Sequence, residues 1–322
     1  MRRLFVLAAL LFALPAHAVT IDWVTVGDPG NVPDTDPYLY PSICGPDWDQ
    51  PCGSVSYTYR IGKYEVTNAQ YAEFLNAVAV TDTNFLYSPS MQITRSGDPG
   101  SYAYSVITGH ENMPVNFVGF LDAVRFANWM HNGQPSGGQD ATTTEDGAYT
   151  FSDYWTIGPR NPGATVFLPT EDEWYKAAYY DAASMSYLDY PAGSDTPPTC
   201  ALPGAMANTA NCDYAVGDLT EVGSYTGSPS PYGTFDQGGN VWEWNETIVS
   251  GSYRGLRGGS YINSSGNLAA SIRSYSTLSY EVDHIGFRVA MIPEPSTALL
   301  LAAGLAGLAA EQRRRSAIGQ RR

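Results

Sequence analysis

Residues 236–244 read Asp236-Gln237-Gly238-Gly239-Asn240-Val241-Trp242-Glu243-Trp244, a glycine-rich turn that leads into an aromatic segment. Two carboxylates, Asp236 and Glu243, flank the turn, and the backbone carbonyls of such a turn can converge between them. Calcium takes six to eight oxygen ligands, so a mixture of carboxylates and carbonyls suits it. The alternative is a turn in which both carboxylates only accept hydrogen bonds from backbone amides. The stretch therefore predicts either a calcium site or a hydrogen-bonded turn.

Five more blocks flank this stretch. They are Tyr59-Arg60-Ile61-Gly62-Lys63-Tyr64-Glu65-Val66-Thr67-Asn68, Met113-Pro114-Val115-Asn116, Phe167-Leu168-Pro169-Thr170-Glu171-Asp172-Glu173-Trp174, Leu256-Arg257-Gly258-Gly259-Ser260-Tyr261 and Gly286-Phe287-Arg288. With Gly239–Trp244, and in this order, they resemble the signature of the formylglycine-generating enzyme family, also called the sulfatase-modifying factor family. The resemblance covers residues 20–292 and implies an irregular, loop-rich α+β fold related to the C-type lectin fold. We expect a single domain over residues 19–292.

The resemblance also assigns calcium ligands at the glycine-rich turn. The family binds calcium there through one side chain, two carbonyls and a glutamate. These groups correspond to the Asp236 side chain, the carbonyls of Gly239 and Val241, and the Glu243 side chain. We therefore expect calcium as a cofactor.

Copper is the cofactor that the sequence argues against. Family members that oxidise a sulfatase cysteine hold copper(I) with two cysteines that follow the Gly-Gly-Ser block, and Cu(I) requires soft thiolate ligands. In this chain the two positions are Asn263 and Leu268, and no cysteine occurs after Cys212. The sequence predicts that copper-dependent formylglycine formation is absent, and it assigns no catalytic residue.

Nonheme iron is a second cofactor of the family. The sulfoxide synthases that are relatives in this family hold the iron with histidines from an added N-terminal helical domain. We expect this chain to lack that domain. The histidines that remain after signal cleavage, His110, His131 and His284, are scattered without ligand spacing. The sequence therefore predicts no iron site.

A stretch rich in Ser, Asn and Tyr, residues 261–284, stands where the copper centre would be. Small hydroxyls, amides and tyrosines form adaptable recognition surfaces, and in C-type-lectin-like relatives the same region displays the binding face. We assign Tyr261, Asn263, Arg273 and Tyr280 to a ligand-binding face. The alternative is a solvated loop of an exported protein.

Two classes of function follow from these sites. The first is a surface-displayed binding or structural module, stabilised by calcium, that takes an extracellular glycan or protein ligand. The alternative is a divergent oxidoreductase or other enzyme of the sulfatase-modifying factor family that acts on exported proteins. A resembling pyoverdine-maturation enzyme acts without the copper or iron ligands, which keeps this alternative open.

Local patterns predict three helices and four strands. Capping boxes, Thr67 with Gln70 and Thr170 with Glu173, begin helices that continue to residues 78 and 178. The third helix covers residues 120–130 because its apolar residues recur on one side. Strands are expected at residues 54–60, 64–66, 255–261 and 286–291.

The four cysteines form two pairs that are close in sequence. We predict disulfides between Cys44 and Cys52 and between Cys200 and Cys212, because an exported protein meets an oxidising compartment. Zinc is the alternative, but no histidine stands at ligand spacing nearby.

Both ends of the chain carry targeting signals. Arg2-Arg3, the apolar run 4–14 and Ala16-His17-Ala18 form a secretory signal peptide, residues 1–18, with cleavage after Ala18. Residues 293–315 contain Pro293-Glu294-Pro295, an apolar stretch at 297–310 and three arginines, and they resemble a PEP-CTERM sorting tail, which exosortase processes. We expect a short transmembrane helix there, a basic cytoplasmic tail at 316–322, and transient anchoring at the cell envelope or surface. An ordinary C-terminal anchor is the alternative.

Charge restricts the possible partners. Residues 19–292 contain 30 acidic and 10 basic residues, a net charge of −20. Nucleic-acid binding needs clustered cations, so this class of partner is excluded.

Overall fold

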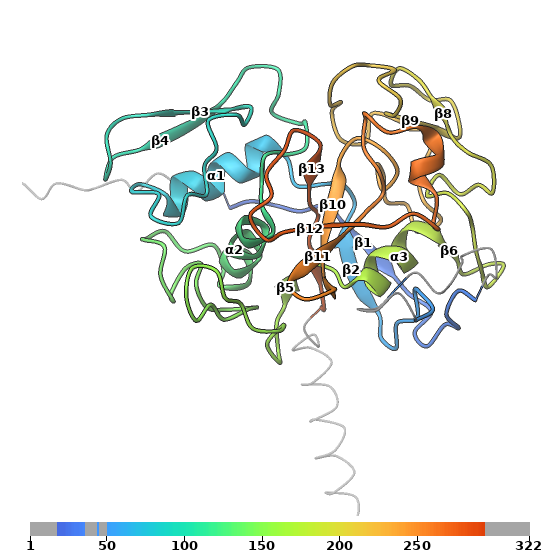
Figure 1. Cartoon of the computed structure of the whole chain (residues 1–322), viewed down its shortest axis with the longest axis horizontal. Coiled ribbons are helices and arrows are strands. Elements are labelled where there is room, and N and C mark those ends of the chain that lie inside the picture. Colours follow the sequence, from blue (N-terminus) through green and yellow to red (C-terminus); the bar gives the residue numbers. More distant parts are fainter. Residues whose placement is uncertain (1–17, 36–43, 45–49, 294–322) are drawn as a thin grey trace, which may run out of the picture.

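The computed structural model describes residues 18–35, 44 and 50–293 (Figure 1). Its helices are α1 (Asn68–Val78), α2 (Phe120–His131) and α3 (Glu171–Tyr179), with a 3-10 turn η1 (Ser265–Leu268). Its strands are β1 (Trp23–Val26), β2 (Tyr59–Gly62), β3 (Ile93–Ser96), β4 (Ala103–Val106), β5 (Val166–Phe167), β6 (Tyr180–Asp181), β7 (Ser186–Tyr187), β8 (Thr199–Cys200), β9 (Thr209–Ala210), β10 (Trp242–Val249), β11 (Tyr253–Arg257), β12 (Ser274–Ser276), β13 (Ile285–Gly286) and β14 (Ala290–Met291). The α+β, loop-rich, single-domain prediction is confirmed.

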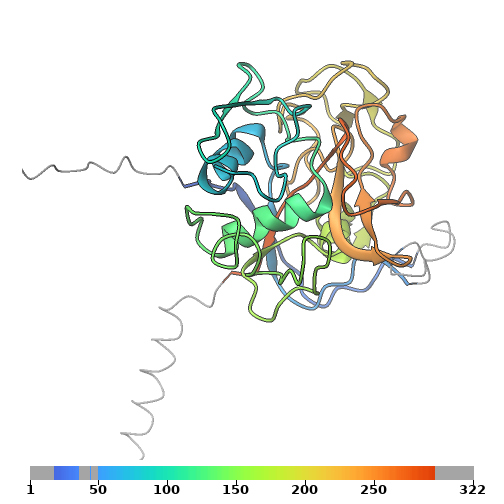
Figure 2. The ribbon, with the colours of Figure 1, turned by 60° about the vertical axis from the view of Figure 1, so that its left-hand side comes forward.

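Two four-stranded sheets form the centre of the molecule. One has the order β1-β2-β14-β5 and is antiparallel, and the other has the order β12-β11-β10-β13 with a parallel pair between β10 and β13. Helices α1 and α2 lie on one side of these strands and α3 on the other (Figure 1). The irregular segments 132–165 and 211–233 run over the outside (Figure 2).

The predicted helices begin where their caps place them. The side chain of Thr67 accepts a hydrogen bond from the backbone of Gln70, the side chain of Thr170 accepts one from the backbone of Glu173, and both capping boxes are complete. Each box satisfies backbone amides that the first helical turn leaves without partners. The apolar face of α1 is fully buried, and Phe74 meets Phe126 of α2 edge-on at 5.4 Å between ring centroids. This aromatic packing joins the two helices in the main core.

The strand predictions were only partly right. Residues 54–58 and 64–66 are not strands, and β11 ends at Arg257 because Gly258 and Gly259 adopt φ of +98° and +71°. The predicted strand 286–291 is two strands in different sheets, β13 and β14, because the chain crosses between the sheets at Phe287–Val289. The longest strand, β10, was missed, as were β1 and the β3–β4 hairpin.

Both predicted disulfides are confirmed. The Cα atoms are 5.3 Å apart in Cys44–Cys52 and 4.9 Å apart in Cys200–Cys212. The four cysteines of the chain are therefore all paired.

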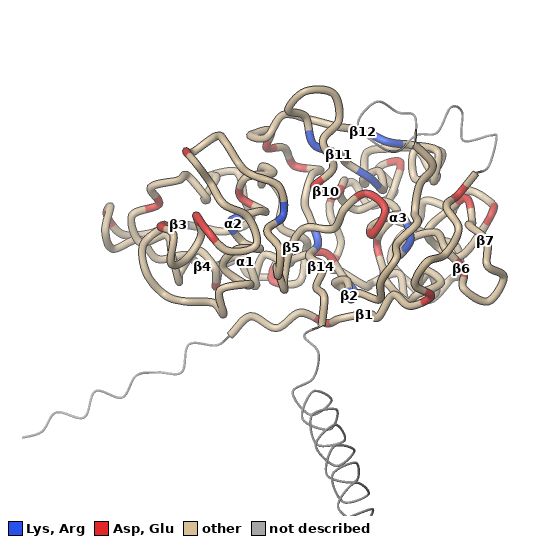
Figure 3. The backbone as a smooth tube through the Cα atoms, turned by 90° about the horizontal axis from the view of Figure 1, so that it is seen from below, with Lys and Arg blue, Asp and Glu red and all other residues tan. Residues whose placement is uncertain are grey.

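The described chain ends at Pro293, which follows β14 at the same end of the molecule as β1. Strands β11 and β12 lie at the opposite end, and acidic residues are spread along the whole tube (Figure 3). Among the described residues no helix is long and apolar enough to cross a membrane. Residues 1–17 of the predicted signal peptide and the predicted helix at 297–310 lie outside the described residues.

Candidate functional site

The glycine-rich turn is fixed by unusual backbone conformations. Asp236, Gly239 and Asn240 have φ of +60°, +90° and +57°. A Cβ atom on Gly239 would lie 2.3 Å from the carbonyl oxygen of Asn211, so only glycine fits there. Asn240 donates its backbone N–H to the same carbonyl, which holds the turn against the chain before β10.

A buried ion pair follows the turn. Glu243, on β10, accepts hydrogen bonds from Arg288 at 2.6 Å (Nε to Oε2) and 2.7 Å (Nη2 to Oε1). The indole N–H of Trp174, on α3, donates to the same Oε2 at 2.8 Å. All three side chains are fully buried. Both oxygens of Glu243 are therefore engaged by protein donors.

Two more carboxylates face the same guanidinium. Glu65 accepts from the Asn240 side chain at 3.1 Å, and its other oxygen lies 4.0 Å from Arg288 without a hydrogen-bond partner among the described residues. Asp236 accepts from the Gly223 amide. Burial raises the pKa of Glu65 well above its usual range, with the charge of Asp236 as the next cause, and burial raises the pKa of Asp236 to about 6. Three carboxylates thus share one guanidinium, and a proton or a cation would neutralise the surplus.

The predicted calcium ligands fit this centre only in part. The surplus negative charge and the oxygen donors suit a hard cation, but the Glu243 carboxylate already pairs with Arg288. Within residues 18–35, 44 and 50–293, no three His, Cys, Asp or Glu side chains are grouped to hold a metal. A calcium ion here would depend on Asp236 and on the backbone carbonyls of Gly239 and Val241. Sequence reasoning missed Glu65 and Arg288, although both stand in quoted blocks.

Asn263 stands at the first of the two positions where the family's copper enzymes carry a cysteine, and its side chain accepts three hydrogen bonds. The side-chain oxygen of Asn263 accepts from the backbone N–H of Ser260 at 3.0 Å, from its hydroxyl at 2.7 Å and from the indole N–H of Trp242 at 2.9 Å. Asn263 thereby ties the loop after β11 to the start of β10. It acts here as an internal brace.

The second position, Leu268, lies in an apolar cluster. Its side chain is fully buried against Tyr190, Ala210 and Cys212, at the end of η1. The side chains at the two positions thus supply an amide and an aliphatic group.

A family model described as the sulfatase-modifying factor enzyme 1-like domain matches residues 50–292. The chain belongs to this family. A second model, the PEP-CTERM protein-sorting motif, matches residues 292–315. This motif is a sorting signal for exosortase processing, and it implies export and association with the envelope, as predicted.

Several relatives of this sulfatase-modifying factor family member are enzymes by name. Hercynine oxygenase of Mycolicibacterium smegmatis is 26% identical over 259 residues, 68% of this chain and 49% of the relative. Formylglycine-generating enzyme of Thermomonospora curvata is 27% identical over 242 residues, 65% of each chain. The chain thus spans about half to two thirds of the length of these relatives.

A solved structure supports the family's fold. Treponema denticola variable protein 1 aligns with a TM-score of 0.54 and 22% identity, covering 87% of this chain and 98% of that one. The likeness shows that the two proteins share a fold.

The residues predicted to form the ligand-binding face do not all reach the surface of this family member. Arg273 has a fully buried side chain that pairs with Glu171 at 2.7 Å, and Tyr261 is 8% exposed with its hydroxyl on Asp283. Of the predicted four, only Tyr280, at 44%, is well exposed. We therefore correct the assignment of Arg273, which braces α3.

Two further tyrosines are exposed near this face, and the sequence analysis did not single them out. Tyr253 of β11 and Tyr275 of β12 are 39% and 46% exposed and meet edge-on at 5.4 Å. They lie on neighbouring strands, where antiparallel pairing brings together these two residues 22 positions apart. No local pattern indicates them, because Tyr253 is the one exposed residue of β11.

Proposed function

We propose that this sulfatase-modifying factor family protein is an exported, envelope-associated binding or structural module rather than a copper oxidase. One observation carries the proposal. Asn263 stands where the resemblance places a copper thiolate, and its side-chain oxygen accepts hydrogen bonds from Ser260 and Trp242. Leu268 and the four disulfide-bonded cysteines support it, because none of them offers a thiolate.

The positions of the exposed tyrosines and of the C-terminal tail also support a binding role at the cell surface. Strands β11 and β12, which carry the exposed Tyr253 and Tyr275, lie at the end of the molecule opposite β14, the strand that precedes the sorting tail (Figure 3). Transient anchoring through residues 297–310 would point these tyrosines away from the membrane. Aromatic side chains that are exposed in this way suit glycan or protein ligands.

The exported protein is expected to produce no formylglycine from a Cys-x-Pro-x-Arg peptide supplied with copper and oxygen. The Thermomonospora relative, assayed in parallel by mass spectrometry, is the positive control. On a glycan and peptide array the same preparation should retain a ligand, and Tyr280→Ala should weaken the retention. Conversion of the peptide, or oxygen uptake with any thiol substrate, would favour the alternative of a divergent oxidoreductase, which the names of the relatives keep open.

Calcium is the cofactor that we propose for the turn at 236–243. At a free calcium concentration about 100 times the Kd, binding should raise the free energy of unfolding by about 2.7 kcal/mol. Chelation with EGTA is therefore expected to lower the melting temperature by about 5 °C. Asp236→Asn should abolish the response to EGTA, and Asp98→Asn, in the exposed turn between β3 and β4, should leave it intact. An unchanged melting curve together with no calcium by elemental analysis would refute the site.

A further inference from the structure

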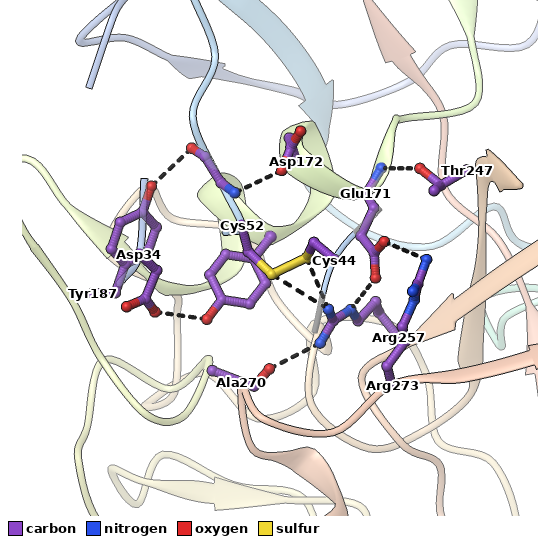
Figure 4. Close-up of a disulfide and its surroundings, with 12 residues drawn as sticks. Asp34, Cys44, Cys52, Glu171, Asp172, Tyr187, Thr247, Arg257, Ala270 and Arg273 are labelled. Atoms are coloured by element: carbon purple, nitrogen blue, oxygen red, sulfur yellow. Dashed lines mark hydrogen bonds and ion pairs between the residues drawn. A yellow bond between two sulfur atoms is a disulfide. The ribbon is translucent and has the colours of Figure 1, made fainter. Parts of the chain in front are cut away.

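A buried guanidinium lies against the Cys44–Cys52 disulfide (Figure 4). Nη2 of Arg257 is 3.1 Å from Sγ of Cys44 and 3.8 Å from Sγ of Cys52. Arg257 is fully buried, and the two cysteines are 2% and 1% exposed. The contact therefore takes place away from water, where electrostatic effects are strong.

The other donors of Arg257 have strong acceptors. Nε donates to Glu171 at 2.8 Å, and Nη1 donates to the carbonyls of Ala270 and Ile272 at 2.8 and 2.9 Å. In the described part of the chain, the partners of Nη2 are the two sulfur atoms. A neutral sulfur is a weak acceptor. Nη2 therefore makes the weakest hydrogen bonds of the three nitrogens of this guanidinium.

Two guanidiniums and three carboxylates lie around the disulfide (Figure 4). Arg257 and Arg273 share one carboxylate, because Oε1 of Glu171 takes Arg257 and Oε2 takes Arg273 at 2.7 Å (Figure 4). The nearby Asp172 carboxylate accepts from the backbone of Gly53, and burial raises its pKa to about 6, while the Asp34 carboxylate accepts from the hydroxyl of Tyr175 at 2.7 Å. Among the described residues, Nη2 of Arg257 contacts the two sulfur atoms and no carboxylate, so it is the donor placed to hold a thiolate.

We propose that Cys44–Cys52 is a redox-active disulfide whose reduced form is stabilised by Arg257. An external small-molecule dithiol supplies two electrons: its thiolate attacks one sulfur, the Cys44–Cys52 bond breaks, and a second attack releases the reagent as its own disulfide. Cys52 leaves as a thiol and Cys44 as a thiolate held by Nη2, so one of the two protons of the dithiol goes to solvent. Stabilising the reduced form makes a disulfide a stronger oxidant, and an adjacent cation favours the thiolate.

The second disulfide is an internal control. Cys212 lies in an apolar cluster with Tyr190, Ala210 and Leu268. Among the described residues, no Arg or Lys nitrogen is within hydrogen-bonding distance of Cys200 or Cys212. This bond should therefore lack the stabilisation of its reduced form.

The test compares both bonds in one molecule. The exported protein is equilibrated in buffers of reduced and oxidised dithiothreitol until the ratios stop changing, because buried sulfurs exchange slowly, and each cysteine pair is then quantified by alkylation and peptide mass spectrometry. We expect the equilibrium constant for reduction of Cys44–Cys52 to exceed that of Cys200–Cys212 at least tenfold, which corresponds to about 30 mV. Equal constants, or a lower one for Cys44–Cys52, would overturn the proposal.

A variant separates the role of charge from a purely structural role. Glu171→Gln keeps a hydrogen-bond acceptor for Arg257 but removes the negative charge, so reduction of Cys44–Cys52 should become about tenfold more favourable while Cys200–Cys212 stays unchanged. In the reduced variant, Cys44 should also alkylate at lower pH than Cys200. If the equilibrium constants for reduction of both disulfides rise by the same factor, the variant has only destabilised the fold, and the proposed charge effect is wrong.

Discussion

Arg288→Met is expected to lower the free energy of unfolding by about 3–5 kcal/mol, the usual effect of removing one partner of a buried ion pair. The variant leaves Glu243 without the two donors that Arg288 supplies at 2.6 and 2.7 Å. It also removes the positive charge nearest to Glu65 and Asp236. Urea unfolding followed by tryptophan fluorescence measures the loss.

Two controls sharpen this result. Arg60→Met, at an exposed position of β2, should change the free energy of unfolding by no more than about 0.5 kcal/mol. The double variant Arg288→Met with Glu243→Gln should recover part of the loss, because it no longer buries an unpaired carboxylate. A loss below about 1 kcal/mol in the single variant would mean that protons or a cation already neutralise the three carboxylates.

The helices could be predicted because their signals are local. A capping box spans four residues, and the apolar face of α1 recurs every three or four residues, so neither depends on the rest of the chain. Most strands are only two to five residues long and are selected by distant partners. Residues 286–291 illustrate this: apolar residues surround Arg288 in this run, but only the neighbours β10 and β2 determine where it divides.

The candidate site was predictable in outline but not in its pairing. The resemblance located the turn at 236–243, yet the ion pair joins Glu243 to a residue 45 positions later, and no local pattern specifies it. Arg273 stands among serines and tyrosines and so looks exposed, but it pairs with Glu171, about 100 positions earlier. Long-range charge pairing is thus the information that a single sequence did not provide.

Asp122, at the start of α2, should make the protein less stable as the pH rises. Burial, and then the negative charge of Glu281, raises the pKa of Asp122 to about 8, while its carboxylate accepts a hydrogen bond from the Gly119 amide at 2.8 Å. An unfolded chain releases this proton near pH 3.9. The stabilisation is therefore complete below about pH 4 and is lost as the pH rises through 8.

Asp122→Asn removes this dependence because an amide keeps the acceptor for Gly119 but carries no charge at any pH. Relative to the unsubstituted protein, the variant should gain about 2–4 kcal/mol of unfolding free energy between pH 5 and pH 9, since one pKa unit corresponds to about 1.4 kcal/mol. Urea unfolding at the two pH values measures the gain, and the exposed Asp98→Asn is the matched control. A constant difference between the variant and the unsubstituted protein would show that Asp122 is charged in the folded state at pH 5, with Arg125, the nearest cation among its electrostatic partners, outweighing burial.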